Sequence, residues 1–173
     1  MNLKNIHTER LLIVPVTLEI TQSLLDGSSK EIEKIGMKTD KYWPTKDTLD
    51  ILPIINVSLE KDKIPSGFEF WMIVKKDNMQ VVGDIGFHGK PNAEGEVEVG
   101  FGLVERERGK DLAFEALKAI VNWLSFQHSV KYIRADCLIS NKSSARTLEK
   151  VGMKEISRDH DLIYWELINS IIQ

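Results

Sequence analysis

The residues best suited to chemistry gather between positions 96 and 111. A strand over 96–103 would carry Glu98, Gly100 and Gly102 on one face, because strand side chains alternate. A charged turn containing Gly109 follows, and apolar residues then repeat at helical spacing over 112–124. Unpaired amides at the start of that helix would suit an anion such as a phosphate. A tight connection with nothing bound explains the turn equally well, and strand glycines can equally mark a bulge.

Two common nucleotide cradles are absent from the chain. There is no G-x-x-x-x-G-K-S/T segment and no G-x-G-x-x-G segment after a strand. A phosphate bound at the turn would therefore belong neither to a triphosphate nor to a dinucleotide held in the usual way.

The elements that must position these residues follow from periodicity. Strands are expected over 10–16, 68–75, 81–88, 96–103, 131–138, 155–158 and 162–168. Helices are expected over 18–25, 47–61, 112–126 and 142–151, and Pro53 would either kink the second helix or mark its real start. The order favours an α+β fold, a single mixed sheet with helices on both faces.

Composition bounds the class of protein. We expect one domain over 1–173, with 42% hydrophobic and 28% charged residues as in an ordinary soluble protein. A net charge of −3 without a basic run argues against nucleic-acid binding. The single cysteine, Cys137, fits a reducing compartment and is expected in the core. Because no apolar run suggests a secretory signal or a membrane span, we expect a cytoplasmic protein without membrane partners.

Three ordered motifs carry a family resemblance. The stretch VGFGLVERERGKDLAFEAL resembles the acyl-CoA-binding motif of the GNAT superfamily of N-acetyltransferases, written Q/R-x-x-G-x-G/A. TERLLIVP at 8–15 and NKSSARTLEKVGM at 141–153 are similar to signatures of its ribosomal-protein alanine and serine N-terminal acetyltransferase branch. The resemblance thins between positions 26 and 66.

The resemblance implies a fold and a cosubstrate. It implies an acyl-CoA N-acyltransferase fold of about seven strands, in which the strands over 96–103 and 131–138 run parallel and splay apart. Acetyl-CoA would enter that gap and give its acetyl group to an amine by direct attack, with no metal. Its binding residues would be Phe101, Leu103, Val104, Arg108, Gly109, Lys110, Asp111, Leu112, Ala113, Asn141 and Ser144.

Catalytic candidates follow from the need to deprotonate the amine and protonate the leaving thiolate. Glu98 is the first candidate base and His88 the second, although each could be a solvated surface residue. The position that carries a general-acid tyrosine in many relatives is Leu148, so the resemblance points to Ser144 as proton donor or thiol partner. Ser144 could instead be a plain residue of the first helical turn, and Asn141 its N-cap.

The main departure from the motif is Asp111, which stands where glycine or alanine is usual. We expect its carboxylate to lie beside the pyrophosphate and weaken binding, so that Asp111→Gly would bind CoA more tightly. We also expect that variant to melt lower, because aspartate suits the first turn of a helix.

The acceptor is the least determined part. We expect region 26–66 and the strip Glu94, Glu96 and Glu98 to contact a cationic amine, either a small molecule or a protein N-terminus. Tyr42, Trp43, Phe68 and Trp71 could line its pocket or belong to the core. A homodimer is left open. The alternative reading is a degenerate relative that binds acyl-CoA or a protein without turnover.

Overall fold

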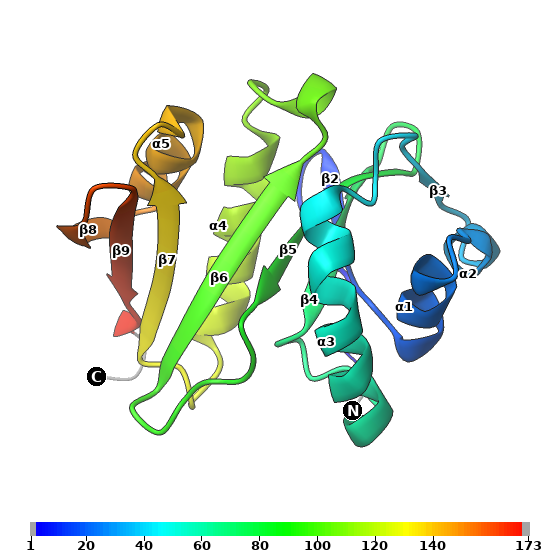
Figure 1. The fold of residues 1–173 in the computed structure, drawn as a ribbon, viewed down its shortest axis with the longest axis horizontal. Helices are drawn as coiled ribbons and strands as arrows, with labels where there is room; N and C mark the ends of the chain where they lie inside the picture. Colours follow the sequence, from blue (N-terminus) through cyan, green and yellow to red (C-terminus); the bar gives the residue numbers. More distant parts are fainter. Residues whose placement is uncertain (1–2, 171–173) are drawn as a thin grey trace.

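The chain folds as one mixed sheet with helices on both faces (Figure 1), described for residues 3–170 of a computed structural model. The strands are β1 (Ile6–His7), β2 (Leu11–Pro15), β3 (Lys38–Thr39), β4 (Phe70–Lys75), β5 (Gln80–Phe87), β6 (Glu96–Leu103), β7 (Tyr132–Leu138), β8 (Lys154–Arg158) and β9 (Leu162–Ile168). The helices are α1 (Leu18–Leu25), α2 (Lys30–Lys34), α3 (Lys46–Asp62), α4 (Leu112–Ser125) and α5 (Lys142–Lys150), with a short 3-10 turn at Glu105–Glu107.

Within the described residues the sheet has nine strands, in the order β1-β2-β4-β5-β6-β7-β9-β8 with β3 beside β5. The seven strands predicted from periodicity are confirmed. The two others, β1 and β3, have only two residues each, which is too short for a two-residue period to show.

Two helices begin at threonine caps, of which Thr17 was expected and Thr45 was not predicted. Thr17 accepts a hydrogen bond from the Ile20 amide at the start of α1, and Thr45 does the same for the Thr48 amide at the start of α3. Pro53 lies inside α3 rather than at its start. No helix within residues 3–170 is long and apolar enough to cross a membrane.

The two faces of the sheet differ at β6: one face packs in the core, and the other is more open. Figure 1 shows α4 behind the sheet and α3 in front of it. Val97, Val99 and Leu103 of β6 are buried in the core, together with the apolar stripe of α4. The opposite face of β6, which carries the glycines, is turned toward α3 and is less filled.

β6 pairs with its two neighbours along different halves. It is antiparallel to β5 from Val99 to Leu103, but parallel to β7 only from Glu96 to Glu98. Beyond Glu98 the two parallel strands separate, as predicted, and the gap opens at the end of β6 that leads into α4 (Figure 1).

Candidate active site

The unpaired edge of β6 lies in this gap. The Val104 amide donates to the Val82 carbonyl (2.8 Å) and the His88 amide to the Glu98 carbonyl (3.1 Å), so even-numbered residues of β6 bond to β5. By strand alternation, Phe101 and Leu103 direct their backbone groups into the gap. Val104 does not extend this edge as predicted, because its amide is bound to Val82 and its carbonyl accepts from the Glu107 amide (3.0 Å).

The turn after β6 is fixed to the strand and leaves amides free at the start of α4. Nε of Arg108 donates to the Leu103 carbonyl (3.2 Å). Gly109 has φ +74°, a left-handed conformation that glycine adopts without strain. The first hydrogen bond of α4 runs from the Glu115 amide to the Asp111 carbonyl (3.1 Å). The amides before Glu115 therefore have no partner within the helix and suit an anion.

A cavity of about 470 Å³ joins this turn, the free edge of β6 and the start of α5. Among the residues predicted to bind the cosubstrate, its lining includes Phe101, Leu103, Arg108, Gly109, Asp111, Leu112, Ala113, Asn141 and Ser144. Lys110 is not among them: its ammonium group pairs with Glu107 (3.0 Å) and its carbonyl accepts from Arg10 (2.9 Å). Arg146 and Lys150 of α5, which belong to the motif NKSSARTLEKVGM, border the cavity as well, although the sequence analysis assigned neither of them a role.

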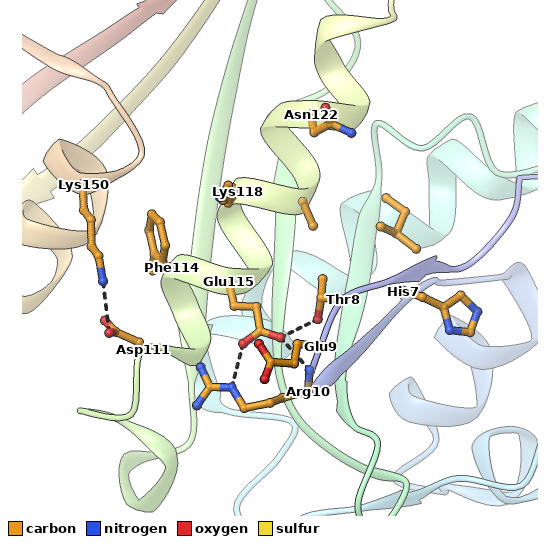
Figure 2. Close-up of a pocket in the computed structure, with 12 residues that line it drawn as sticks. His7, Thr8, Glu9, Arg10, Asp111, Phe114, Glu115, Lys118, Asn122 and Lys150 are labelled. Carbon is orange, nitrogen blue, oxygen red and sulfur yellow. Dashed lines mark hydrogen bonds and ion pairs between the residues drawn. The ribbon is translucent and has the colours of Figure 1, made fainter.

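Asp111 is placed differently from the sequence-based expectation (Figure 2). It is the N-cap residue of α4, not a first-turn residue, and it has the left-handed φ of +62°. Glycine is favoured in that conformation, which accounts for the usual residue of the motif. The Asp111 carboxylate also pairs with Nζ of Lys150 (3.0 Å), which lies 4.3 Å from the Phe114 ring centroid. Its charge is therefore balanced by α5.

The start of α5 presents two polar residues to the same cavity. The Asn141 side-chain oxygen accepts from the Ser144 amide (3.1 Å), as an N-cap. This bond uses the oxygen of Asn141 and leaves its amino group available. Ser144 borders the cavity, whereas Leu148, at the position of the general-acid tyrosine of many relatives, is buried at 1% exposure and offers no hydroxyl.

The N-terminal motif holds α4 in place. Glu115 accepts from the Thr8 hydroxyl (2.6 Å) and from Nε and the amide of Arg10 (both 2.7 Å), as Figure 2 shows. Burial raises the pKa of Glu115, but these hydrogen bonds and the Arg10 charge outweigh it, so the pKa lies below its usual value. Because Arg10 also donates to the Lys110 carbonyl, the segment TERLL positions the turn of the first cavity.

On the other face of β6, the glycines leave open space. A Cβ placed on Gly100 or Gly102 would meet no atom within 4 Å. The register from Val99 to Leu103 is continuous, so these glycines mark no bulge. Beneath α3 they border a second cavity of about 600 Å³. Gly102, Phe101, Leu103, Arg108 and Asp47 border both cavities, which are therefore adjacent.

Both candidate bases meet at the end of this glycine face. Nδ1 of His88 lies 3.2 Å from Oε2 of Glu98, and His88 borders the second cavity. Asp136 of β7 completes the cluster. Its pKa is raised by partial burial, by a hydrogen bond to Glu98 and by the Glu98 charge, while the His88 charge opposes the shift. Asp136 was not predicted, because only the short pairing of β6 with β7 brings it beside Glu98.

Only some of the residues predicted to contact the acceptor border the second cavity. Region 26–66 does contribute, since α3 covers the second cavity, and Phe68 borders it. Glu96 instead pairs with Arg134 (2.9 Å), and none of the predicted residues Glu94, Glu96 and Glu98 lines the cavity, although Glu98 lies beside His88, which does. Tyr42 is 62% exposed and Trp71 is a core residue.

Trp43 is buried and does not line the second cavity, but it contacts Asp84, which does. Its indole N–H donates to Asp84 (2.8 Å). Cys137 is buried, as expected.

Comparison with known proteins gives the same family by two routes, a family model and a sequence relative. The model of the acetyltransferase (GNAT) domain matches residues 10–154. An uncharacterized N-acetyltransferase of Bacillus subtilis, YjdG, is 35% identical over 146 residues, covering 82% of this chain and 87% of its own length.

Solved structures share the fold. The ribosomal-protein-S5-alanine acetyltransferase from Vibrio fischeri superposes with a TM-score of 0.66 at 15% identity, covering 96% of this chain and 97% of its own. The microcin C7 self-immunity acetyltransferase MccE, solved in complex with acetyl-CoA and AMP, gives a TM-score of 0.63 at 15% identity and 93% coverage of both chains.

Proposed function

Because the chain belongs to the GNAT acetyltransferase family and is an acyltransferase, we propose that it transfers the acetyl group of acetyl-CoA to a primary amine by direct attack. The observation that carries this proposal is the meeting of two cavities at Phe101 and Gly102. One has the free amides and cationic side chains that suit a pyrophosphate, and the other leads to a pair of candidate bases.

The first cavity fits acetyl-CoA. Acetyl-CoA supplies the activated acetyl group when bound. The amides of residues 109–113 would hold its pyrophosphate at the N-terminus of α4, with Arg108, Arg146 and Lys150 adding positive charge. The backbone of Phe101 and the amide of Leu103 would pair with the pantetheine arm, as an added strand pairs with a sheet edge, while the Leu103 carbonyl already accepts from Nε of Arg108. The amino group of Asn141 and the hydroxyl of Ser144 are placed to contact the same arm.

The second cavity would receive the amine. An amine must lose a proton to attack, and most free amines are protonated near neutrality. Glu98 would take that proton directly or through one water, with His88 beside it to orient or share the charge. Ser144 would donate to the departing thiolate, because Leu148 offers no hydroxyl.

A thiol-release assay tests this function. Purified protein is incubated with acetyl-CoA and a panel of amines, free CoA is measured, and each product is checked by mass for one added acetyl group. We expect amine-dependent CoA release and an acetylated amine. Tight binding of acetyl-CoA without any acetylated product would overturn the proposal and favour a binding module.

A further inference from the structure

The second cavity has a wall of branched aliphatic side chains. Ile51, Ile54 and Ile55 of α3 follow the i, i+3, i+4 spacing that places side chains on one helix face, and all three border the cavity. Opposite them lie the glycine positions of β6, where no side chain covers the backbone. A bound molecule would therefore meet aliphatic carbon on one side and a flat strand on the other.

Two of the carboxyl groups that border the cavity, those of Glu69 and Asp84, accept hydrogen bonds from neighbouring groups. Glu69 is 3% exposed and accepts from the Ser66 amide (3.0 Å), the Ser66 hydroxyl (2.8 Å) and the Gly67 amide (3.0 Å). Asp84 accepts from the indole N–H of Trp43 (2.8 Å) and the Thr48 hydroxyl (2.6 Å). Burial raises the pKa of Asp84, despite those hydrogen bonds, and so disfavours its charge.

The remaining charges lie at the two ends of the cavity. Asp47 and Arg108, which carry opposite charges, both border the junction with the first cavity. His88 borders the cavity at the other end of the glycine face, and Glu98, which is not part of the lining, lies beside His88. The middle of the cavity thus offers little uncompensated negative charge to a polycation, and much aliphatic surface.

We propose that the preferred acceptor is a primary amine borne on an apolar group, with the amine at Glu98 and the apolar group against the isoleucines of α3. This inference rests on the proposed acetyl transfer and narrows its substrate class. It also revises the expectation, drawn from acidic residues alone, of an acceptor selected by positive charge. An apolar group in a matched pocket commonly changes kcat/KM by about ten- to two-hundredfold for each methylene-sized difference.

The first experiment compares amines that differ in the group attached. Hexylamine and phenethylamine are measured against putrescine, spermidine and an aminoglycoside, by CoA release and product mass. Peptides beginning with Leu or Phe are compared with peptides beginning with Ser or Lys. This second set shows whether the acceptor amine is a peptide N-terminus or a small free amine. We expect the apolar members of each set to have kcat/KM values about tenfold or more above the polar members.

The outcomes separate the two proposals. A polyamine or aminoglycoside acetylated as well as the apolar amines would overturn this inference and leave acetyl transfer intact. An absence of acetylated product with every amine would overturn the proposed function itself.

The second experiment changes the aliphatic wall. Ile54 is 73% exposed and borders the cavity, whereas Val57 is 65% exposed on the same helix and does not border it. Both positions tolerate a lysine without loss of core packing, so Val57→Lys is a matched control for Ile54→Lys. We expect Ile54→Lys to lower kcat/KM for the best apolar amine about tenfold, with the KM for acetyl-CoA unchanged, and Val57→Lys to stay within about twofold. Equal effects of the two variants would show that α3 does not contact the acceptor.

Discussion

Nζ of Lys150 lies 3.0 Å from the carboxylate of Asp111, so the last turn of α5 and the N-cap of α4 form an ion pair across the edge of the proposed cosubstrate cavity. The pair is exposed, with side-chain exposures of 50% for Lys150 and 66% for Asp111. Its direct effect on stability is therefore small, about 0–1 kcal/mol. Its larger consequence is that Lys150 is shared between Asp111 and any phosphate bound nearby.

Removing the Asp111 charge should strengthen CoA binding. Asp111→Asn keeps a residue that tolerates φ +62° and frees Lys150 for the phosphates. We expect Kd for CoA to fall by less than about tenfold at low salt, and the gain to shrink at moderate salt. Calorimetric titration at two salt concentrations measures it, with Lys150→Gln expected to bind more weakly than the parent at low salt. Unchanged binding of Asp111→Asn at low salt would mean that the carboxylate does not sense the phosphates.

Asp111→Gly should bind CoA as tightly as Asp111→Asn without melting lower. Glycine removes a left-handed strain of about 1 kcal/mol, which offsets the lost ion pair. Thermal unfolding of both variants beside the parent checks this. A lower Tm for glycine than for asparagine would contradict the strain argument.

The phosphate cradle can be tested at Gly109. Gly109→Glu places a carboxylate beside the free amides of α4, and we expect it to abolish acetyl-CoA binding. Gly27→Glu is a matched control, because Gly27 has φ +72° against +74° for Gly109 and a Cβ at either position meets no atom within 4 Å. Both variants should therefore lose similar stability, about 1 kcal/mol. Titration with acetyl-CoA decides the matter, and equal binding by the two would remove the cradle.

Among the candidate bases, Glu98 should contribute most to kcat. We expect Glu98→Gln to lower kcat by about a hundredfold, with the KM for acetyl-CoA little changed. Asp136→Asn is the control, because it removes the ionisable carboxyl group beside Glu98 but keeps a hydrogen-bonding side chain there and leaves the candidate base in place; its kcat should fall by less than about tenfold. Steady-state kinetics at saturating acetyl-CoA measures both. Turnover of Glu98→Gln within about twofold of the parent, together with a large loss in His88→Asn, would assign the base to His88 instead.

Stability should depend on pH through Glu115. Its lowered pKa means that the folded state favours the carboxylate, so the stabilisation is complete above the unfolded value of about 4.3 and is lost as pH falls through the lower folded value. We expect Glu115→Gln to cost about 2 kcal/mol at pH 7, and the difference from the parent to shrink below about pH 4. Urea unfolding at neutral and acidic pH measures it. Glu9→Gln, a change at the exposed acid next to Arg10, should have no such effect, and a pH-independent cost at Glu115 would contradict the charge argument.

Much of the fold was determined locally. The two-residue period of the seven longer strands and the caps Thr17 and Asn141 predicted elements that the structure confirms. The glycines of β6 and Gly109 were predicted to leave room for a ligand, and in the structure a Cβ at Gly100, Gly102 or Gly109 would meet no atom within 4 Å. These features depend on neighbouring residues and on backbone conformations that single residue types favour.

Tertiary structure alone decided which charges and cavities act together. Lys150 reaches Asp111 across 39 residues, and Asp136 reaches Glu98 because β6 and β7 pair for three residues before they separate. Asp111 looked like a first-turn aspartate until the backbone gave it a left-handed φ as the N-cap. Of the isoleucines of α3, Ile55 belongs to the core as well as to the cavity wall, whereas Ile54 is 73% exposed, and a helical stripe in the sequence does not reveal this difference. Such relationships come from the packing of distant segments, which local periodicity does not encode.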